Sequence, residues 1–416
     1  RTFFLEGSEI FNFGTTSNES FAPFFSRRIG LYEGAQVPIA FGTKVFGRLG
    51  HTNLAFLDVL TEKSLGLPGQ NFLAGRVRQN IFSESNVGII FTNGSPAGGR
   101  NTLAGFDLTY QTSRFRGDQN FSVGGWYVYN WNEKKSGKHR GFGFKIDYPN
   151  DLWDIMTMYS YYGDSLDPGL GFLPRNGVQS WSFGCNYMPR PEKGWVGRQV
   201  RQFFYELRLN FYWDLEGRLE TRRVSLAPLH FQTESGENFE VNVVANRDVL
   251  PYDFEVSDGI VLPRGPYDFT NSQFEFSSAS HRAFEIDLEH RFGEFYSGRL
   301  SETELGFILK HKGYATLAVS ADLVRGNLPQ GRFSENVYEL KADFFVSPRL
   351  GLMNYVQYDD VSKELGVNLR FRWEIAPGNV IYFVYTKNWE RRWDPMSRFA
   401  PLEERGVFKI QLSIRP

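Results

Sequence analysis

The sequence of 416 residues has little cysteine, little histidine and no long apolar segment. Its one cysteine, Cys185, excludes an internal disulfide framework. The six histidines are scattered, and none lies at metal-ligand spacing from a second histidine or a cysteine. We therefore predict no metal site, no cofactor and no catalytic residue, and an outer-membrane hydrolase is the least favoured class of function.

Charge and hydropathy exclude two further classes of protein. No run of ten apolar residues occurs, whereas a membrane-spanning helix needs about 20. The 46 basic and 47 acidic residues nearly cancel, so the charge gives no support for nucleic-acid binding. No signal peptide opens the sequence, and since an exported protein carries one, we expect Arg1 to be a processed or internal start.

Aromatic residues and glycine are abundant instead, with 40 Phe, 20 Tyr, 9 Trp and 42 Gly. Residues 364–389 show how these residues are arranged. From residue 365 to residue 375 every second side chain is apolar, and most of the side chains between them are polar. Because a β-strand places successive side chains on opposite faces, this pattern predicts a strand with one apolar and one polar face. A turn at residues 376–379 and an aromatic strand follow.

The same unit, an alternating strand of about 10 to 14 residues plus a turn, recurs along most of the chain. We predict an all-β fold, a large closed antiparallel transmembrane β-barrel of about 20–22 strands. Residues 38–416 form the barrel in this interpretation, and residues 1–37 form an N-terminal entry or plug segment. A soluble β-propeller or β-sandwich is the main rival, but no repeat of about 40 to 50 residues is present.

Turn and loop lengths indicate which ends of the strands face the periplasm and which face outward, because bacterial barrels have short turns on the periplasmic side and longer outer loops. We expect long outer loops at residues 163–176, 250–266 and 389–406, where glycine, proline and charged residues gather. With this assignment, the strand that begins at Pro38 runs from the outer side towards the periplasmic side. We therefore expect a further strand within residues 21–31.

Residues 1–37 alternate poorly and carry charges of both signs. One interpretation is a plug, in which the charged side chains pair inside the lumen. The other is an ordinary first strand with its loop. The candidate plug charges are Glu6, Glu9, Arg27 and Arg28.

Charged side chains on the polar faces of the strands are expected to line the lumen, since the interiors of porin-like barrels are polar. Because both signs occur, we predict no strong ion selectivity. The 389–406 loop carries aromatic and charged candidates for contact with a saccharide or a partner protein, or for anchoring at the membrane interface. The lumen candidates are Glu206, Arg208, Arg370, Arg372 and Glu374, and the outer-loop candidates are Trp389, Arg391, Arg392 and Trp393.

Several short stretches resemble a known family of bacterial outer-membrane barrels. They are Phe-Phe-Leu-Glu-Gly at 3–7, Ser-Arg-Arg-Ile-Gly at 26–30, Gly-Thr-Lys at 42–44, Gly-Arg-Leu-Gly at 47–50, Thr-Leu-Ala-Gly-Phe-Asp at 102–107 and Arg-Phe-Arg-Trp at 370–373. The family is uncharacterised, and its barrel commonly follows a carbohydrate-binding module of the family 9 type. The resemblance implies a barrel over essentially the whole chain, a location in the bacterial outer membrane and a possible saccharide ligand. It transfers no catalytic residue.

Two functions from different classes fit this sequence. The first is a channel or uptake component in the outer membrane, with a saccharide as a candidate solute. The second is a plugged membrane anchor or scaffold that holds a surface domain or a protein complex. An open, charged lumen favours the first function, and a lumen filled by residues 1–37 favours the second.

Overall fold

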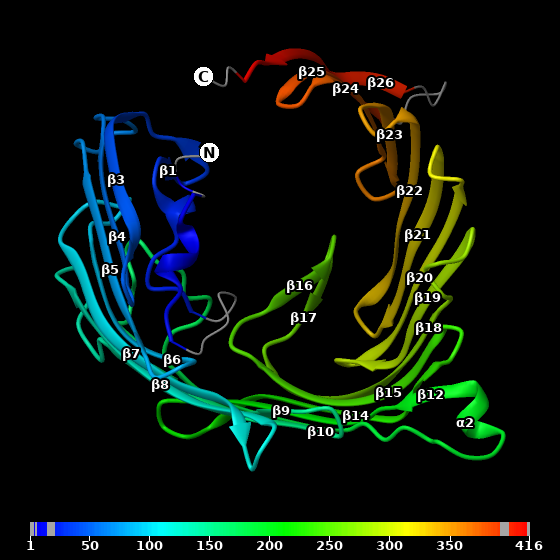
Figure 1. Cartoon of the computed structure of the whole chain (residues 1–416), viewed down its shortest axis with the longest axis horizontal. Coiled ribbons are helices and arrows are strands. Elements are labelled where there is room, and N and C mark those ends of the chain that lie inside the picture. The colour runs from blue at the N-terminus through cyan, green and yellow to red at the C-terminus, as the bar shows by residue number, and fades with distance from the viewer. Residues whose placement is uncertain (1–3, 5, 15–20, 392–398, 414–416) are drawn as a thin grey trace. The chain divides into compact units, whose positions relative to one another are not determined.

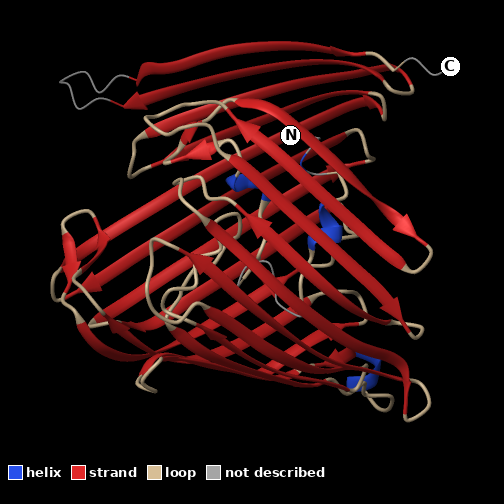
Figure 2. Ribbon diagram, turned by 90° about the vertical axis from the view of Figure 1, so that its left-hand side faces the viewer, coloured by secondary structure: helices blue, strands red, loops and turns tan. Residues whose placement is uncertain are grey.

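The structure is a computed structural model that describes residues 4, 6–14, 21–391 and 399–413. Its strands β3 to β15 and β18 to β26 form one large antiparallel sheet of 22 strands, which confirms the predicted all-β class and strand number. Figure 2 shows these long strands joined by turns and loops, with a few short helices. None of the helices in the described part of the chain is long and apolar enough to cross a membrane.

The sheet strands occupy most of the chain after residue 38. The first thirteen are β3 (Ile39–Leu49), β4 (Thr52–Thr61), β5 (Asn71–Ile81), β6 (Ser85–Asn93), β7 (Asn101–Phe115), β8 (Gln119–Asn132), β9 (Arg140–Pro149), β10 (Trp153–Tyr162), β11 (Val178–Tyr187), β12 (Val200–Phe203), β13 (Tyr205–Asp214), β14 (Leu219–Thr233) and β15 (Asn238–Leu250). The other nine are β18 (Gly265–Ser277), β19 (Phe284–Phe295), β20 (Gly298–His311), β21 (Ala315–Leu328), β22 (Gly331–Ser347), β23 (Leu350–Asp359), β24 (Glu364–Ala376), β25 (Asn379–Arg391) and β26 (Phe399–Gln411).

Small elements lie outside this sheet. The N-terminal segment, residues 1–37, contains η1 (Ser8–Phe11), η2 (Ser26–Arg28) and a hairpin of β1 (Leu31–Tyr32) and β2 (Ala35–Gln36). The helix α2 (Val196–Gln199) precedes β12, and β16 (Phe254–Ser257) pairs with β17 (Ile260–Leu262). The further sheet strand expected within residues 21–31 is therefore wrong, because these residues form η2 and part of a separate two-stranded hairpin.

The expected long loop at residues 389–406 is also corrected. β25 continues to Arg391 and β26 begins at Phe399, so most of this stretch is strand. The acidic and basic residues at 403–405 hide the alternation there. Both faces of this part of β26 are exposed, and a strand with two exposed faces needs no apolar side chain at every second position.

The chain divides into two compact units. The first comprises residues 1–187 and 207–224, and the second comprises residues 188–206 and 225–416. This division differs from the predicted boundary at residue 37, because the N-terminal segment shares its apolar clusters with the strands of the first unit.

In the first unit, strands β4 to β10 have two different faces. The covered face, which the N-terminal segment packs against, carries Leu57, Ala74, Ile90, Leu103 and Val128, all buried. The opposite open face carries aromatic and aliphatic side chains that are exposed, among them Ile89 at 58% and Phe106 at 56%. Alternation along each strand and direct register between strands keep the two sets apart, so strands of the first unit carry apolar side chains on both faces of the sheet.

In the second unit, alternation separates a polar face from an apolar face. Ile286, Phe307, Val319, Leu340 and Val356 lie directly opposite one another on successive strands β19 to β23. This apolar face is exposed, as Phe284 at 50% and Phe344 at 52% illustrate. The residues between them point to the other face and are mostly charged or polar.

Candidate functional site

The N-terminal segment packs tightly on the covered face of the first unit. Ile10, Phe11 and Ile29 join a buried cluster with residues of β4 and β5 and with Leu170. Phe13 and Phe21 enter a second cluster around Trp126 of β8, and the Phe21 and Trp126 rings stack with centroids 5.1 Å apart. Figure 1 shows the segment, in dark blue, running alongside the strands of this unit. Apolar burial therefore provides most of its attachment.

The loop expected at residues 163–176 takes part in the same packing. Ala22 forms a β-bridge with Phe172, with backbone N–H to O distances of 2.9 and 2.7 Å. The backbone N–H of Phe25 also donates to the carbonyl of Leu170 at 2.7 Å. Leu166 and Leu170 are buried in the two clusters. The loop thus holds the N-terminal segment in place.

A buried ion pair lies beneath the segment. Arg76 of β5 and Asp107 of β7 form a bidentate pair, with Nη1–Oδ1 and Nη2–Oδ2 distances of 2.5 and 2.8 Å. Their side chains are 0% and 3% exposed. The backbone N–H of Gly14 donates to Asp107 Oδ2 at 3.0 Å, and the Arg76 guanidinium lies 5.3 Å from the Phe13 ring centroid. The pair therefore joins the sheet to the segment.

Gly88 of β6 makes room for this pair. A Cβ atom there would lie 2.6 Å from Arg76 Nη1 and 2.8 Å from both Cζ and Nη2. The guanidinium therefore crosses β6 only because that residue has no side chain. A charged residue beside Phe72 and Ala74 on one face of β5 was the sequence signal for this arrangement.

The four predicted plug charges do not form the expected pairs. Glu6, Glu9 and Arg27 are exposed and Arg28 is half-buried, and in the described part of the chain none of the four has an ion-pair partner. Lys44 Nζ donates to the backbone carbonyl of Glu6. Apolar contacts and the Arg76–Asp107 pair fix the segment instead.

The polar face of the second unit brings together carboxylates that are far apart in the sequence. Direct cross-strand pairing runs through five acidic residues on β15, β18, β19, β20 and β21. We call this set the carboxylate row: Glu240, Glu275, Glu289, Glu304 and Asp322. Like charges directly opposite one another destabilise a sheet unless cations or hydrogen-bond donors compensate them.

Donors compensate only part of the carboxylate row. Gln273 Nε2 donates to Glu275 at 2.7 Å and to Glu289 at 2.5 Å, and an Arg291 nitrogen lies 3.5 Å from a Glu289 oxygen. Glu304 and Asp322 receive no side-chain hydrogen bond from any residue that the structure describes. A hollow of about 320 Å³ lies over the row, lined also by Ser277, Asp287 and Ser320. This face can therefore hold water and mobile cations.

The loop at residues 250–266 is folded rather than extended. Its β16–β17 hairpin buries Ile260 and Leu262 against Leu328, and the Ser257 hydroxyl donates to Glu335 of β22 at 2.8 Å. Glu335 and Glu339 lie four residues apart on β22, so their side chains point to the same face of the sheet. Glu339 lies directly opposite Ser320, which is on the polar face. The hairpin, which projects from the sheet in Figure 1, therefore contacts the polar face of β22 near the start of that strand.

The other predicted charges fall in different places. Arg370, Arg372 and Glu374 share the polar face of β24, where Arg372 Nη2 lies 2.7 Å from Glu374 Oε2. Arg208 is exposed on β13. Glu206 of β13 contacts His230 of β14, with 3.0 Å between Glu206 Oε1 and His230 Nδ1. Charges of both signs thus share the polar face of β24, and Glu206 contacts a histidine that the sequence alone did not indicate.

Two of the four outer-loop candidates, Trp389 and Arg391, lie at the end of β25. The Lys387 ammonium lies 5.4 Å from the Trp389 ring centroid, and the Arg391 backbone N–H donates to the Lys363 carbonyl at 2.9 Å. Arg392 and Trp393 lie outside the described residues. Trp389 and Arg391 are strand residues rather than loop residues, so their role in ligand contact stays a prediction.

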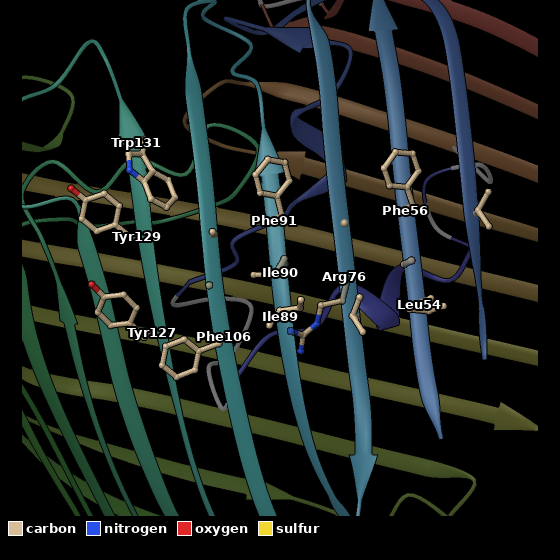
Figure 3. Close-up of a pocket in the computed structure, with 16 residues that line it drawn as sticks. Leu54, Phe56, Arg76, Ile89, Ile90, Phe91, Phe106, Tyr127, Tyr129 and Trp131 are labelled. Atoms are coloured by element: carbon tan, nitrogen blue, oxygen red, sulfur yellow. The ribbon is translucent and has the colours of Figure 1, made fainter. Parts of the chain in front are cut away.

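The open face of the first unit forms a wide apolar groove of about 860 Å³. Figure 3 shows its aromatic side chains, Phe56, Phe91, Phe106, Tyr129 and Trp131, standing along neighbouring strands. An exposed apolar surface of this extent is rare on a protein that is surrounded by water. Such surfaces mark sites of contact with a membrane, a ligand or a partner protein.

No family model matches the sequence, and no curated protein matches it. The barrel family that the sequence resembles therefore stays a prediction, together with the saccharide that the resemblance implies.

Proposed function

We propose that the chain is an outer-membrane β-barrel of a Gram-negative bacterium that passes small hydrophilic solutes across the membrane. The observation that carries this proposal is the two-faced sheet of the second unit. An exposed apolar face lies directly behind a face with a partly uncompensated row of carboxylates. Lipid on one side and water on the other satisfy both faces at once.

The strand lengths support a membrane barrel. β20 and β21 have 14 residues each. At about 3.3 Å per residue and a tilt of about 45°, each would span roughly 30 Å, close to the thickness of the hydrocarbon core. Lipid also forbids free strand edges, so we propose that the sheet closes on itself. The polar face then lines the lumen.

The carboxylate row supports a preference for cations. The sequence offers charges of both signs, but the register groups acidic ones across five adjacent strands. A water-filled passage lined by one sign of charge concentrates counter-ions. We therefore refine the expectation of no strong ion selectivity to a modest preference for cations over anions. The saccharide solute rests on the family resemblance alone.

The anchor function keeps specific support, because the N-terminal segment is buried against its wall by two apolar clusters and an ion pair. Such docking is typical of a permanent plug. Bilayer recordings of the intact chain, and of a chain lacking residues 1–37, separate the two functions. Steps in the intact chain support a channel, silence followed by steps after truncation supports gated uptake, and silence in both supports the anchor.

The cation preference has its own test, the reversal potential across a KCl gradient. We expect the intact chain to prefer K⁺ and the Glu304→Gln variant to lose part of that preference. No described side chain donates a hydrogen bond to Glu304, so its negative charge is left to attract mobile cations. Glu84→Gln is the matched control, because Glu84 lies in the β5–β6 turn and accepts a hydrogen bond from Ser113. An anion preference in the intact chain, or equal effects of the two variants, would contradict the proposal.

A further inference from the structure

The carboxylate row ends at a histidine. Glu206 of β13, His230 of β14 and Glu240 of β15 all belong to the second unit, and their candidate ligand atoms lie within 4.8 Å of one another. His230 Nδ1 is 3.0 Å from Glu206 Oε1 and 3.4 Å from Glu240 Oε2. The three side chains are only 13%, 13% and 16% exposed. We call this set the His230 cluster.

The hydrogen bonds of the imidazole orient it for ligation. Nε2 lies 3.1 Å from Asn238 Oδ1, and the ring stacks on Phe204 with centroids 4.5 Å apart. With Nε2 protonated and donating to Asn238, Nδ1 presents its lone pair to the two carboxylates. Metal-bound histidines commonly have this arrangement, in which the second ring nitrogen donates to an oxygen that fixes the ring. A lone pair facing two anionic oxygens also requires a cation or a proton between them.

The spacing of these atoms suits a small metal ion. Zinc binds nitrogen and oxygen at about 2.0–2.2 Å, so two ligands of a tetrahedral site are about 3.4 Å apart. The two distances from His230 Nδ1 lie close to this value. A nitrogen donor with two carboxylates favours a first-row divalent transition ion over Ca²⁺ or Mg²⁺, which prefer oxygen alone.

We propose that Glu206, His230 and Glu240 bind one divalent transition-metal ion, with Asn238 as the positioning residue. Three protein ligands leave a fourth position for water or a passing solute. The ligands come from three strands separated by turns, so no local spacing in the sequence revealed them. The site is independent of the proposed channel function, since it needs only the described contacts.

Binding of Zn²⁺ and Co²⁺ to the intact chain, refolded in detergent and freed of metal by chelation, tests this site. We expect one ion per chain and a visible Co²⁺ absorption band that Zn²⁺ abolishes. Glu206→Gln, His230→Asn and Glu240→Gln should each weaken the affinity at least tenfold, and Asn238→Ala should weaken it less. His290→Asn is the matched control, because His290 of β19 bonds to Thr303 at 2.9 Å and lies away from the cluster.

X-ray absorption of the zinc-loaded native chain keeps the test independent of how the variants fold. We expect one nitrogen and two or three oxygen neighbours at about 2.0–2.2 Å. Absence of stoichiometric binding, or full affinity in His230→Asn, would overturn the proposal. A shell of several histidines, or equal loss in His290→Asn, would place the metal elsewhere and overturn it too.

Discussion

Replacing Asp107 by Asn should release the N-terminal segment and destabilise the first unit. The change removes the charge that compensates Arg76, whose side chain has no exposed area. Breaking a buried ion pair by removing one partner typically costs about 3–5 kcal/mol. The variant also weakens the acceptor for the Gly14 N–H, a hydrogen bond to a charged group worth about 1.5–3 kcal/mol. The segment should loosen more than the rest of the unit.

A double variant separates these two contributions. In Arg76→Leu/Asp107→Leu no charge stays buried, so the sheet should regain most of its stability. Leucine at position 107 offers no acceptor to the Gly14 N–H, and the segment should stay loose. From the value of a hydrogen bond to a charged group, amide exchange in residues 6–14 should be about tenfold to a hundredfold faster than in the parent chain.

Urea unfolding and hydrogen exchange measured on the same preparations check this reasoning. Glu133→Gln is the matched control, because its pair with Arg100 spans 3.6 Å with side chains 64% and 86% exposed. Exposed pairs of this kind contribute under about 1 kcal/mol. The reasoning fails if Asp107→Asn matches this control. It also fails if the double variant is less stable than the single one.

Three further predictions follow from single contacts. Gly88→Ala should cost about 1–3 kcal/mol in urea unfolding, because its Cβ would overlap the buried guanidinium, whereas Gly75→Ala, with no atom within 4 Å, should cost little. In lipid, Phe307→Arg should cost about 2–4 kcal/mol if its face meets the bilayer, and Ser320→Arg on the polar face much less. Neighbouring hydroxyl groups hold the pKa of Glu237, in the β14–β15 turn, at about 2, below its ordinary 4.5. Its stabilising effect should be full above pH 4.5 and vanish as the pH falls to about 2, and Glu237→Gln should abolish that part of the pH profile of unfolding.

The number and the faces of the strands were predictable because alternation is a local property. In β19, for example, Phe284 and Ile286 against Glu285 and Asp287 assign the two faces without any knowledge of the neighbours. The prediction failed where a strand end is exposed on both faces, as in β26, and where short irregular elements replaced the strand expected before Pro38.

The candidate sites were not predictable because they depend on register between strands. Glu275 and Glu289 become direct neighbours only through the length of the β18–β19 connection, and a shift of one residue would move one of them to the apolar face. The same holds for Arg76 and Asp107, which lie two strands apart and meet across Gly88. Each charge was visible in the sequence, but its partner was not.

Lipid and a partner protein would cover the exposed apolar residues differently. A protein interface of ordinary size covers about 800 Å² on each partner, a patch on a few strands. Here exposed apolar side chains continue across strands β4 to β8 of the first unit and β19 to β22 of the second. Lipid, as proposed, would cover every such strand alike, so substitutions to arginine should be costly on all of them, most at mid-strand and least near the turns. A partner protein would instead confine the cost to a few adjacent strands and leave the others tolerant.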